Sequence, residues 1–157
     1  MRSATFLLLA PLGGCWMPSY VIGSSSSEWY EVPPVSKPPA EVAKMARDLL
    51  LRQGFRLMPE VPGETRAETE WDVHLSSHWR DGFRSKVEVA VEKADDGRTR
   101  TLVRSFREVN ENAKNPSIPE QAIWGNASLD EKHAPKIGEP AIRVHQLLKL
   151  KLEGLSP

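Results

Sequence analysis

The sequence predicts an α+β fold: an antiparallel β-meander of three to four strands packed against an N-terminal and a C-terminal helix. Three observations support this prediction. Segments with apolar residues at helical spacing lie near both ends of residues 40–157, segments of alternating apolar and polar residues lie between them, and turn-forming residues separate those segments. Helices that bracket such strands are typical of a two-layer sandwich. A chain of 157 residues suits one domain of this kind.

Residues 40–53 predict the first helix. Glu41 suits the positive end of the helix dipole, and Gly54 is a natural residue to follow the last turn. Residues 55–58 then predict a short strand that ends at Pro59. The apolar side chains of the helix recur every three or four residues, at Val42, Met45, Ala46, Leu49 and Leu50.

The middle of the chain predicts the meander. Residues 69–75 alternate as a half-buried strand, with Thr69, Trp71, Val73 and Leu75 on one face and Glu70, Asp72 and His74 on the other. After a turn near residues 81–82, residues 87–91 alternate again, and residues 99–108 form the partner strand beyond Asp95-Asp96-Gly97.

Two registers are open for this hairpin. A two-residue turn would pair Val91 with Leu102 and Val87 with Phe106. A three-residue loop with Gly97 as a bulge would instead set Glu92 against Arg100, Glu88 against Arg104, and Val89 beside Val103. We prefer the second register because it places opposite charges across the strands.

The last third predicts a turn-rich break at residues 110–116 and one short helix within residues 117–124, with Ala122 and Trp124 packing inward. Residues 140–153 predict the C-terminal helix, which Gly154 ends. Its broad apolar face contains Ile142, Val144, His145, Leu147, Leu148 and Leu152.

The first residues read as a targeting signal. A positive start at Arg2 precedes a short apolar segment and small residues, which is typical of a secretory signal. Leu12-Gly13-Gly14-Cys15 resembles the bacterial lipobox, and Cys15 is the only cysteine of the chain. The resemblance to bacterial lipoproteins implies that residues 1–14 are removed and that Cys15 carries the acyl chains. The alternative is an ordinary secretory signal with a free thiol at Cys15.

Residues 15–39 predict a lipidated N-terminus and a Ser/Pro-rich tether. A run of four serines and two Pro-Pro pairs does not build a core. Trp16 and Tyr20 suit the membrane interface, whereas Trp29 and Tyr30 suit an N-terminal arm packed on the domain. We then expect a single α+β domain at residues 40–157.

Composition narrows the functional classes. The 21 basic and 21 acidic side chains balance, which argues against a nucleic-acid binder. The sequence contains no nucleophile elbow or phosphate-binding loop, so we expect no enzyme and no cofactor. Asp72, His74 and His78 are close in sequence, but they match no recognised metal-ligand spacing, and a surface cluster is the better interpretation.

The hairpin region contains the densest group of basic residues. Its ordinary interpretation is a solvated sheet face with cross-strand salt bridges. The alternative is a face that binds anionic lipid headgroups, glycan or a partner protein. The residues of this candidate face are Arg84, Lys86, Arg98, Arg100, Arg104 and Arg107.

We therefore expect an envelope lipoprotein that is held to a membrane through Cys15 and acts as a non-catalytic binding or scaffold module for an envelope protein. In a cell with two membranes, Trp16 after the cysteine resembles the pattern exported to the outer membrane, facing the periplasm. The helix–meander–helix order is similar to the periplasmic domains of envelope-assembly lipoproteins. The rival expectation is a tethered enzyme, metal protein or small-ligand binder that uses the Asp72, His74 and His78 region.

Overall fold

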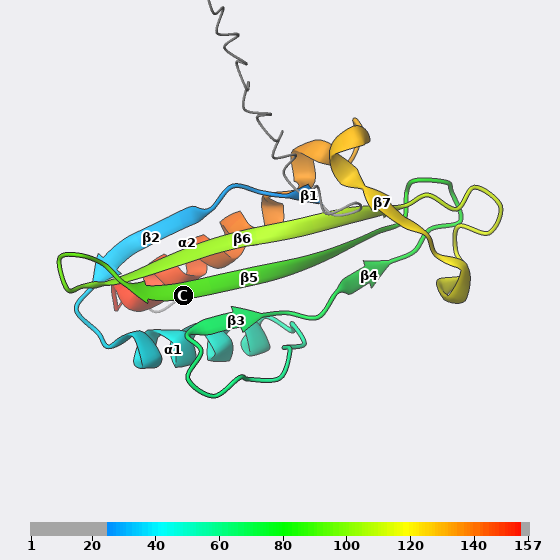
Figure 1. Ribbon diagram of the computed structural model, residues 1–157. Helices are drawn as coiled ribbons and strands as arrows, with labels where there is room; N and C mark the ends of the chain where they lie inside the picture. Colours follow the sequence, from blue (N-terminus) through cyan, green and yellow to red (C-terminus); the bar gives the residue numbers. More distant parts are fainter. Residues whose placement is uncertain (1–24, 155–157) are drawn as a thin grey trace, which may run out of the picture.

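A long hairpin forms the centre of the fold in a computed structural model that describes residues 25–154 (Figure 1). Its strands are β5 (Phe83–Lys93) and β6 (Thr99–Asn110), which pair along their full length. Alternate valines of both strands point to one side and are buried, among them Val87, Val89 and Val103. The alternation in the sequence therefore gives the sheet one apolar face.

Five short strands complete the sheet. Along β6 lie β2 (Tyr30–Val35), β1 (Ser25–Ser26) and β7 (Trp124–Asn126), and along β5 lie β3 (Arg66–Glu68) and β4 (Asp72–His74). All pairings are antiparallel, so the sheet has seven strands. The expected three to four strands were too few, because strands of two or three residues leave no readable alternation.

Both helices cover the apolar face; in Figure 1 the C-terminal helix lies behind β5 and β6, and the N-terminal helix lies below β5, next to β3. They are α1 (Pro39–Arg52) and α2 (Glu139–Leu152), close to the predicted bounds. Leu50 of α1 and Leu148 of α2 are fully buried against the sheet valines. The α+β class is confirmed, but the first helix does not open the domain, since β1 and β2 precede it. In the described part of the chain no helix has the length and apolarity to cross a membrane.

The predicted tether extends too far along the chain. Ser25–Ser26 and Tyr30–Val35 form strands of the sheet, and Val32 is part of the core with 1% of its surface exposed. The register shifts between Val32 and Val35, where Pro33 and Pro34 offer no N–H for the ladder. Two consecutive prolines in a sequence are typical of a linker. In this structure they lie in an edge strand. Cys15 and the rest of the segment that resembles a lipobox lie outside the described residues, so that prediction is not tested by the structure.

The preferred hairpin register is confirmed. Glu92 faces Arg100, Glu88 faces Arg104 and Val89 faces Val103. Gly97 has a φ of +80°, the left-handed conformation that the bulged loop requires. The pairing of opposite charges across the two strands was therefore a correct criterion for choosing between the two registers.

Two local predictions were wrong. Residues 55–58 form only a single bridge, from Leu57 to Thr69. The short helix expected within residues 117–124 is a single 3₁₀ turn, η1 (Pro119–Gln121), and Trp124 already belongs to β7. Two further 3₁₀ turns, η2 (Ala127–Leu129) and η3 (Ala134–Lys136), lead into α2.

Candidate functional site

The side of the sheet opposite the helices carries mainly charged residues, with a few apolar ones among them. Antiparallel partners share a face, so the even-numbered residues of β5 and β6 lie together on this side. Arg66 and Glu68 of β3 join them through their register with β5. We call this surface the open face; its central rows pair Arg84 with Glu108, Lys86 with Phe106, Glu88 with Arg104, Ala90 with Leu102 and Glu92 with Arg100.

Ion pairs connect most of these rows. Arg104 Nε donates to Glu88 Oε2 at 2.7 Å, and Arg66 Nε lies 3.2 Å from the other oxygen of Glu88. Glu88 is only 3% exposed, so its charge is held beneath the two arginine side chains. The remaining pairs are Arg84–Glu108, Arg100–Glu92 and Lys86–Glu68. The ordinary interpretation of the basic stretch, a face with cross-strand salt bridges, describes these contacts.

Aromatic rings stack on the same cations. The Arg84 guanidinium carbon lies 4.5 Å from the ring centroid of Trp71 and 4.7 Å from that of Trp124. The Arg104 guanidinium carbon lies 4.3 Å from Trp29 and 4.8 Å from Phe106. These separations are typical of cation–π contacts. Each of these two arginines is thus fixed by a carboxylate and by two rings.

The rings of the open face were not predicted as a group. Trp29 packs on the domain as the N-terminal arm interpretation required, whereas Trp124, expected to pack inward, lies over Arg84. Trp71 was placed on the wrong side because the strand around it contains a bulge. Glu68 pairs with Glu88, and an uninterrupted register would then pair Asp72 with Arg84, but Asp72 pairs with Ser85. The segment therefore contains one extra residue, and the residues after it lie on the opposite face from the one that strict alternation predicts.

The structure brings four of the six predicted face residues together. Arg84, Lys86, Arg100 and Arg104 all lie on the open face. Arg98 lies in the turn, where its Nε donates to Asp96 Oδ2 at 2.7 Å. Arg107 has an odd number on β6 and therefore points to the helix side of the sheet. The predicted face was wrong for these two residues.

Arg107 forms a separate buried cluster at the β7 end of the sheet. It is 5% exposed, and its guanidinium carbon lies 3.6 Å from the ring centroid of Phe83. Its Nη2 donates to His133 Nδ1 at 3.1 Å, and His133 Nε2 donates to the carbonyl of Arg80 at 2.7 Å. Burial lowers the pKa of both Arg107 and His133. These contacts hold the segment before α2 against the sheet.

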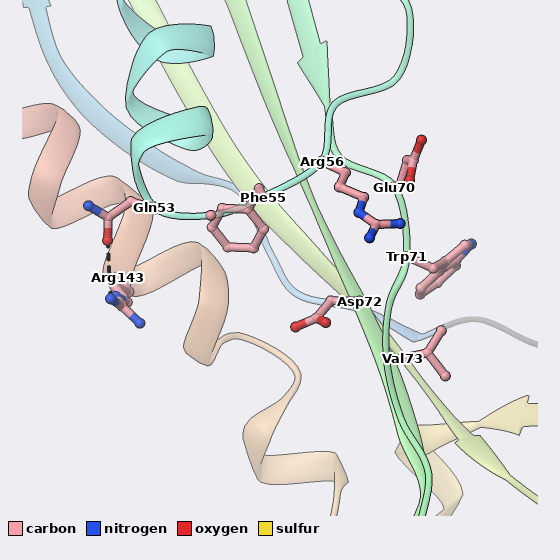
Figure 2. Close-up of a pocket in the computed structure, with 9 residues that line it drawn as sticks. Gln53, Phe55, Arg56, Glu70, Trp71, Asp72, Val73 and Arg143 are labelled. Carbon is pink, nitrogen blue, oxygen red and sulfur yellow. Dashed lines mark hydrogen bonds between the residues drawn. The ribbon is translucent and has the colours of Figure 1, made fainter.

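The predicted Asp72, His74 and His78 region contains a cavity. Between the end of α1, residues 70–73 and α2 lies a cavity of about 610 Å³, with Asp72 and Arg143 in its lining. Figure 2 shows the Asp72 carboxylate turned toward the side of Arg143, while Trp71 turns the opposite way. Arg143 Nη2 donates to Gln53 Oε1 at 3.1 Å.

The two histidines of that region do not share a site. His74 Nε2 lies 2.9 Å from Asp72 Oδ2, but His78 has Ser77 and Asp81 as its neighbours and does not line the cavity. Among residues 25–154, no group of three His, Cys, Asp or Glu side chains lies close enough to hold a metal ion. Asp72 is the one member of the predicted trio that reaches the cavity.

The open face and the cavity are thus two surfaces of the described domain that could receive a ligand. A scan against protein-family models and a search of curated proteins found no match to this chain.

Proposed function

We propose that this protein is a lipid-anchored binding module of the bacterial cell envelope, which acts without catalysis and recognises an envelope protein. The anchor would be Cys15, since the lipobox resemblance, the preceding apolar segment and the single cysteine agree. Two or more acyl chains would make the attachment lasting. In a cell with two membranes, the proposed location is the outer membrane, with the domain in the periplasm.

The open face is the proposed binding surface, and its composition is the observation that carries the proposal. Tryptophan and arginine are the residues most enriched where proteins bind one another with high affinity. Here Trp29 stacks on Arg104, and Trp71 and Trp124 stack on Arg84; Trp29 is 37% exposed and the other two rings are half-buried. The arginines are already ordered, so binding would lose little side-chain entropy.

The charge pattern of the open face supports the proposal of a protein partner over that of a strongly anionic surface. The face carries five cations, at Arg66, Arg84, Lys86, Arg100 and Arg104, and each of them contacts a carboxylate. A polyanion would have to compete with these carboxylates. A protein that carries both signs of charge and some apolar surface complements the pattern better.

In-cell photo-crosslinking tests the proposed face. A photoreactive amino acid at Ala90, in the middle of the open face, should give a discrete crosslinked product in intact cells. The matched control position is Gln146, an exposed residue of α2 on the helix side. A product from Gln146 but none from Ala90 would contradict the open face as the binding surface.

The anchor is tested separately. Mass spectrometry of the membrane fraction should find a chain that begins at acylated Cys15, and the Cys15→Ala variant should lose its attachment to the membrane. A Cys15→Ala variant that stays fully in the membrane fraction would refute the lipid anchor.

Small-ligand binding at the cavity is the second candidate function. Its volume of about 610 Å³ lies within the range of known ligand sites, and its lining carries both signs of charge. Asp72→Asn and Arg143→Gln should then abolish any thermal shift that a ligand screen produces. If these variants keep the full shift, the ligand binds elsewhere.

A further inference from the structure

An exposed leucine lies close to the point where the described chain begins. Leu129, in the 3₁₀ turn η2, is 77% exposed, more than any other large hydrophobic side chain among residues 25–154. Single exposed apolar side chains are ordinary on protein surfaces, so the position of Leu129 relative to the proposed anchor decides what it can contact.

Hydrogen bonds fix this turn to Ser25. Ser128 N donates to Ser25 Oγ at 2.9 Å, and Ser25 Oγ also contacts Asn126 Oδ1. Ser25 itself is held in the sheet, opposite Arg107 of β6. Figure 1 shows β1 beside the segment that leads to α2. Leu129 therefore keeps a constant position relative to the start of the described chain.

The covalent distance from Cys15 is short. Nine residues lie between Cys15 and Ser25, and ten residue-to-residue steps of fully extended chain span at most about 33–36 Å. The Ser25 end of the domain cannot move farther than this from acyl chains on Cys15. The 94–98 turn lies at the other end of β6, eight residues beyond the Ser25 row, or about 27 Å along the strand.

We infer that segment 127–137 is the surface that the anchored domain presents to the lipid bilayer, with Leu129 entering the interfacial region. This inference rests on the lipid anchor proposed above. One leucine gives too little free energy to bind a membrane alone, but the tether holds it at a high effective concentration beside the lipid. The open face is a different surface, formed by β3, β5 and β6, and stays available for a partner.

Fluorescence quenching tests the inference in the full-length acylated chain. Because Cys15 carries the lipid, an introduced cysteine is the only free thiol and can take one fluorophore. We compare Glu131→Cys, which leaves Leu129 in place, with Asp95→Cys, an exposed residue of the distant turn. The vesicles contain zwitterionic and anionic phospholipids and a nitroxide-labelled lipid. Position 131 should be quenched several-fold more strongly than position 95.

A second comparison isolates the leucine. The chain labelled at Glu131→Cys should lose most of its excess quenching when Leu129→Ser is added, and circular dichroism checks that both chains remain folded. Equal quenching at positions 131 and 95 in acylated, vesicle-bound protein would overturn this inference and leave the anchor intact. Absence of acylation at Cys15 in mass spectrometry would refute both the anchor and the inference.

Discussion

At the residue scale, burial decides which ion pairs of the open face matter. The Arg100–Glu92 pair is exposed, and such pairs stabilise a protein by about 0–1 kcal/mol. Glu88 is different because it is buried and contacts both Arg66 and Arg104. A buried carboxylate without a partner would be strongly unfavourable. Glu88 therefore fixes the geometry of the arginine layer above it, whereas Glu92 contributes mainly solubility.

His133 gives the domain a pH-dependent stability. Desolvation by burial is the main cause that lowers its pKa from the ordinary value of 6.5, and the nearby cations Arg107 and Lys132 lower it further. A hydrogen bond to the Arg80 carbonyl and the charge of Asp130 act in the opposite direction. The neutral form also accepts the hydrogen bond from Arg107. Protonation would place two cations side by side.

We expect the free energy of unfolding to fall as the pH drops below 6.5. In that range the unfolded chain binds a proton at His133 more readily than the folded chain does, so stability rises with pH. The stability that neutral His133 contributes is fully present above its pKa in the unfolded chain. It is lost as the pH falls through the lower pKa that His133 has in the folded chain. Urea denaturation between pH 5 and pH 8 measures this slope, and His133→Gln should reduce it.

His78→Gln is the matched control for this prediction. His78 is largely exposed and lies outside the buried cluster, so its replacement should leave the slope nearly unchanged. His74 stacks on Phe83 and bonds to Asp72, so it remains in both variants as a common background. If His133→Gln and the wild type show the same pH slope, His133 does not titrate as its burial requires.

At the element scale, long periodic segments could be predicted and short ones could not. The helices α1 and α2 and the hairpin β5–β6 each extend over eleven or more residues, so their periodicity is clear in the sequence. The strands β1, β3, β4 and β7 have two or three residues and exist because the long strands present unpaired edges to them. For β1 the pairing partners on β6 are also distant in sequence, since Ser25 pairs with Arg107 and Ser26 with Phe106.

The same distinction between long and short segments decides which residues of the open face could be predicted from the sequence. The cations of the open face lie on the long strands, so their common side could be predicted from alternation. The tryptophans lie on an arm, at a bulge and on a three-residue strand, where alternation gives no information. Arg107 lies three positions after Arg104 on the same strand, so strict alternation places the two arginines on opposite faces of the sheet, and only Arg104 belongs to the open face.

Gly97, in the loop of the central hairpin, has a backbone conformation that makes its replacement costly for stability. Gly97 adopts a φ of +80°, and nothing lies within 4 Å of an added Cβ. Gly97→Ala should therefore destabilise the domain by about 1–2 kcal/mol through backbone strain alone. Gly97→Asn should have a smaller effect, since asparagine tolerates this conformation better.

Urea denaturation of both Gly97 variants measures the effect, with Asp95→Ala in the same turn as the control. Unchanged stability of Gly97→Ala would mean that the loop can adopt another conformation without loss.

At the scale of the whole molecule, the domain begins earlier than its sequence pattern indicates. The strand β2 closes one side of the core, where Val32 packs with residues of both helices. Thr99 Oγ1 also donates to the Lys37 carbonyl at 2.5 Å, which ties the segment before α1 to the start of β6. The C-terminal end of this Ser/Pro-rich segment is therefore part of the folded domain.

A comparison of two shortened chains tests this boundary. A chain that begins at Ser25 should fold with nearly the full stability, whereas one that begins at Ala40 should lose β2 and expose part of the core.

Val32→Ala in the full chain separates the effect of core packing from the effect of chain length. It should lower the free energy of unfolding by about 1–3 kcal/mol, because the removed methyl groups leave a cavity. Glu31→Ala on the exposed side of β2 is its control and should change little. Heteronuclear NMR and urea denaturation report folding and stability. If the chain that begins at Ala40 gives the same spectrum and midpoint as the one that begins at Ser25, β2 is dispensable and residues 25–39 are a linker after all.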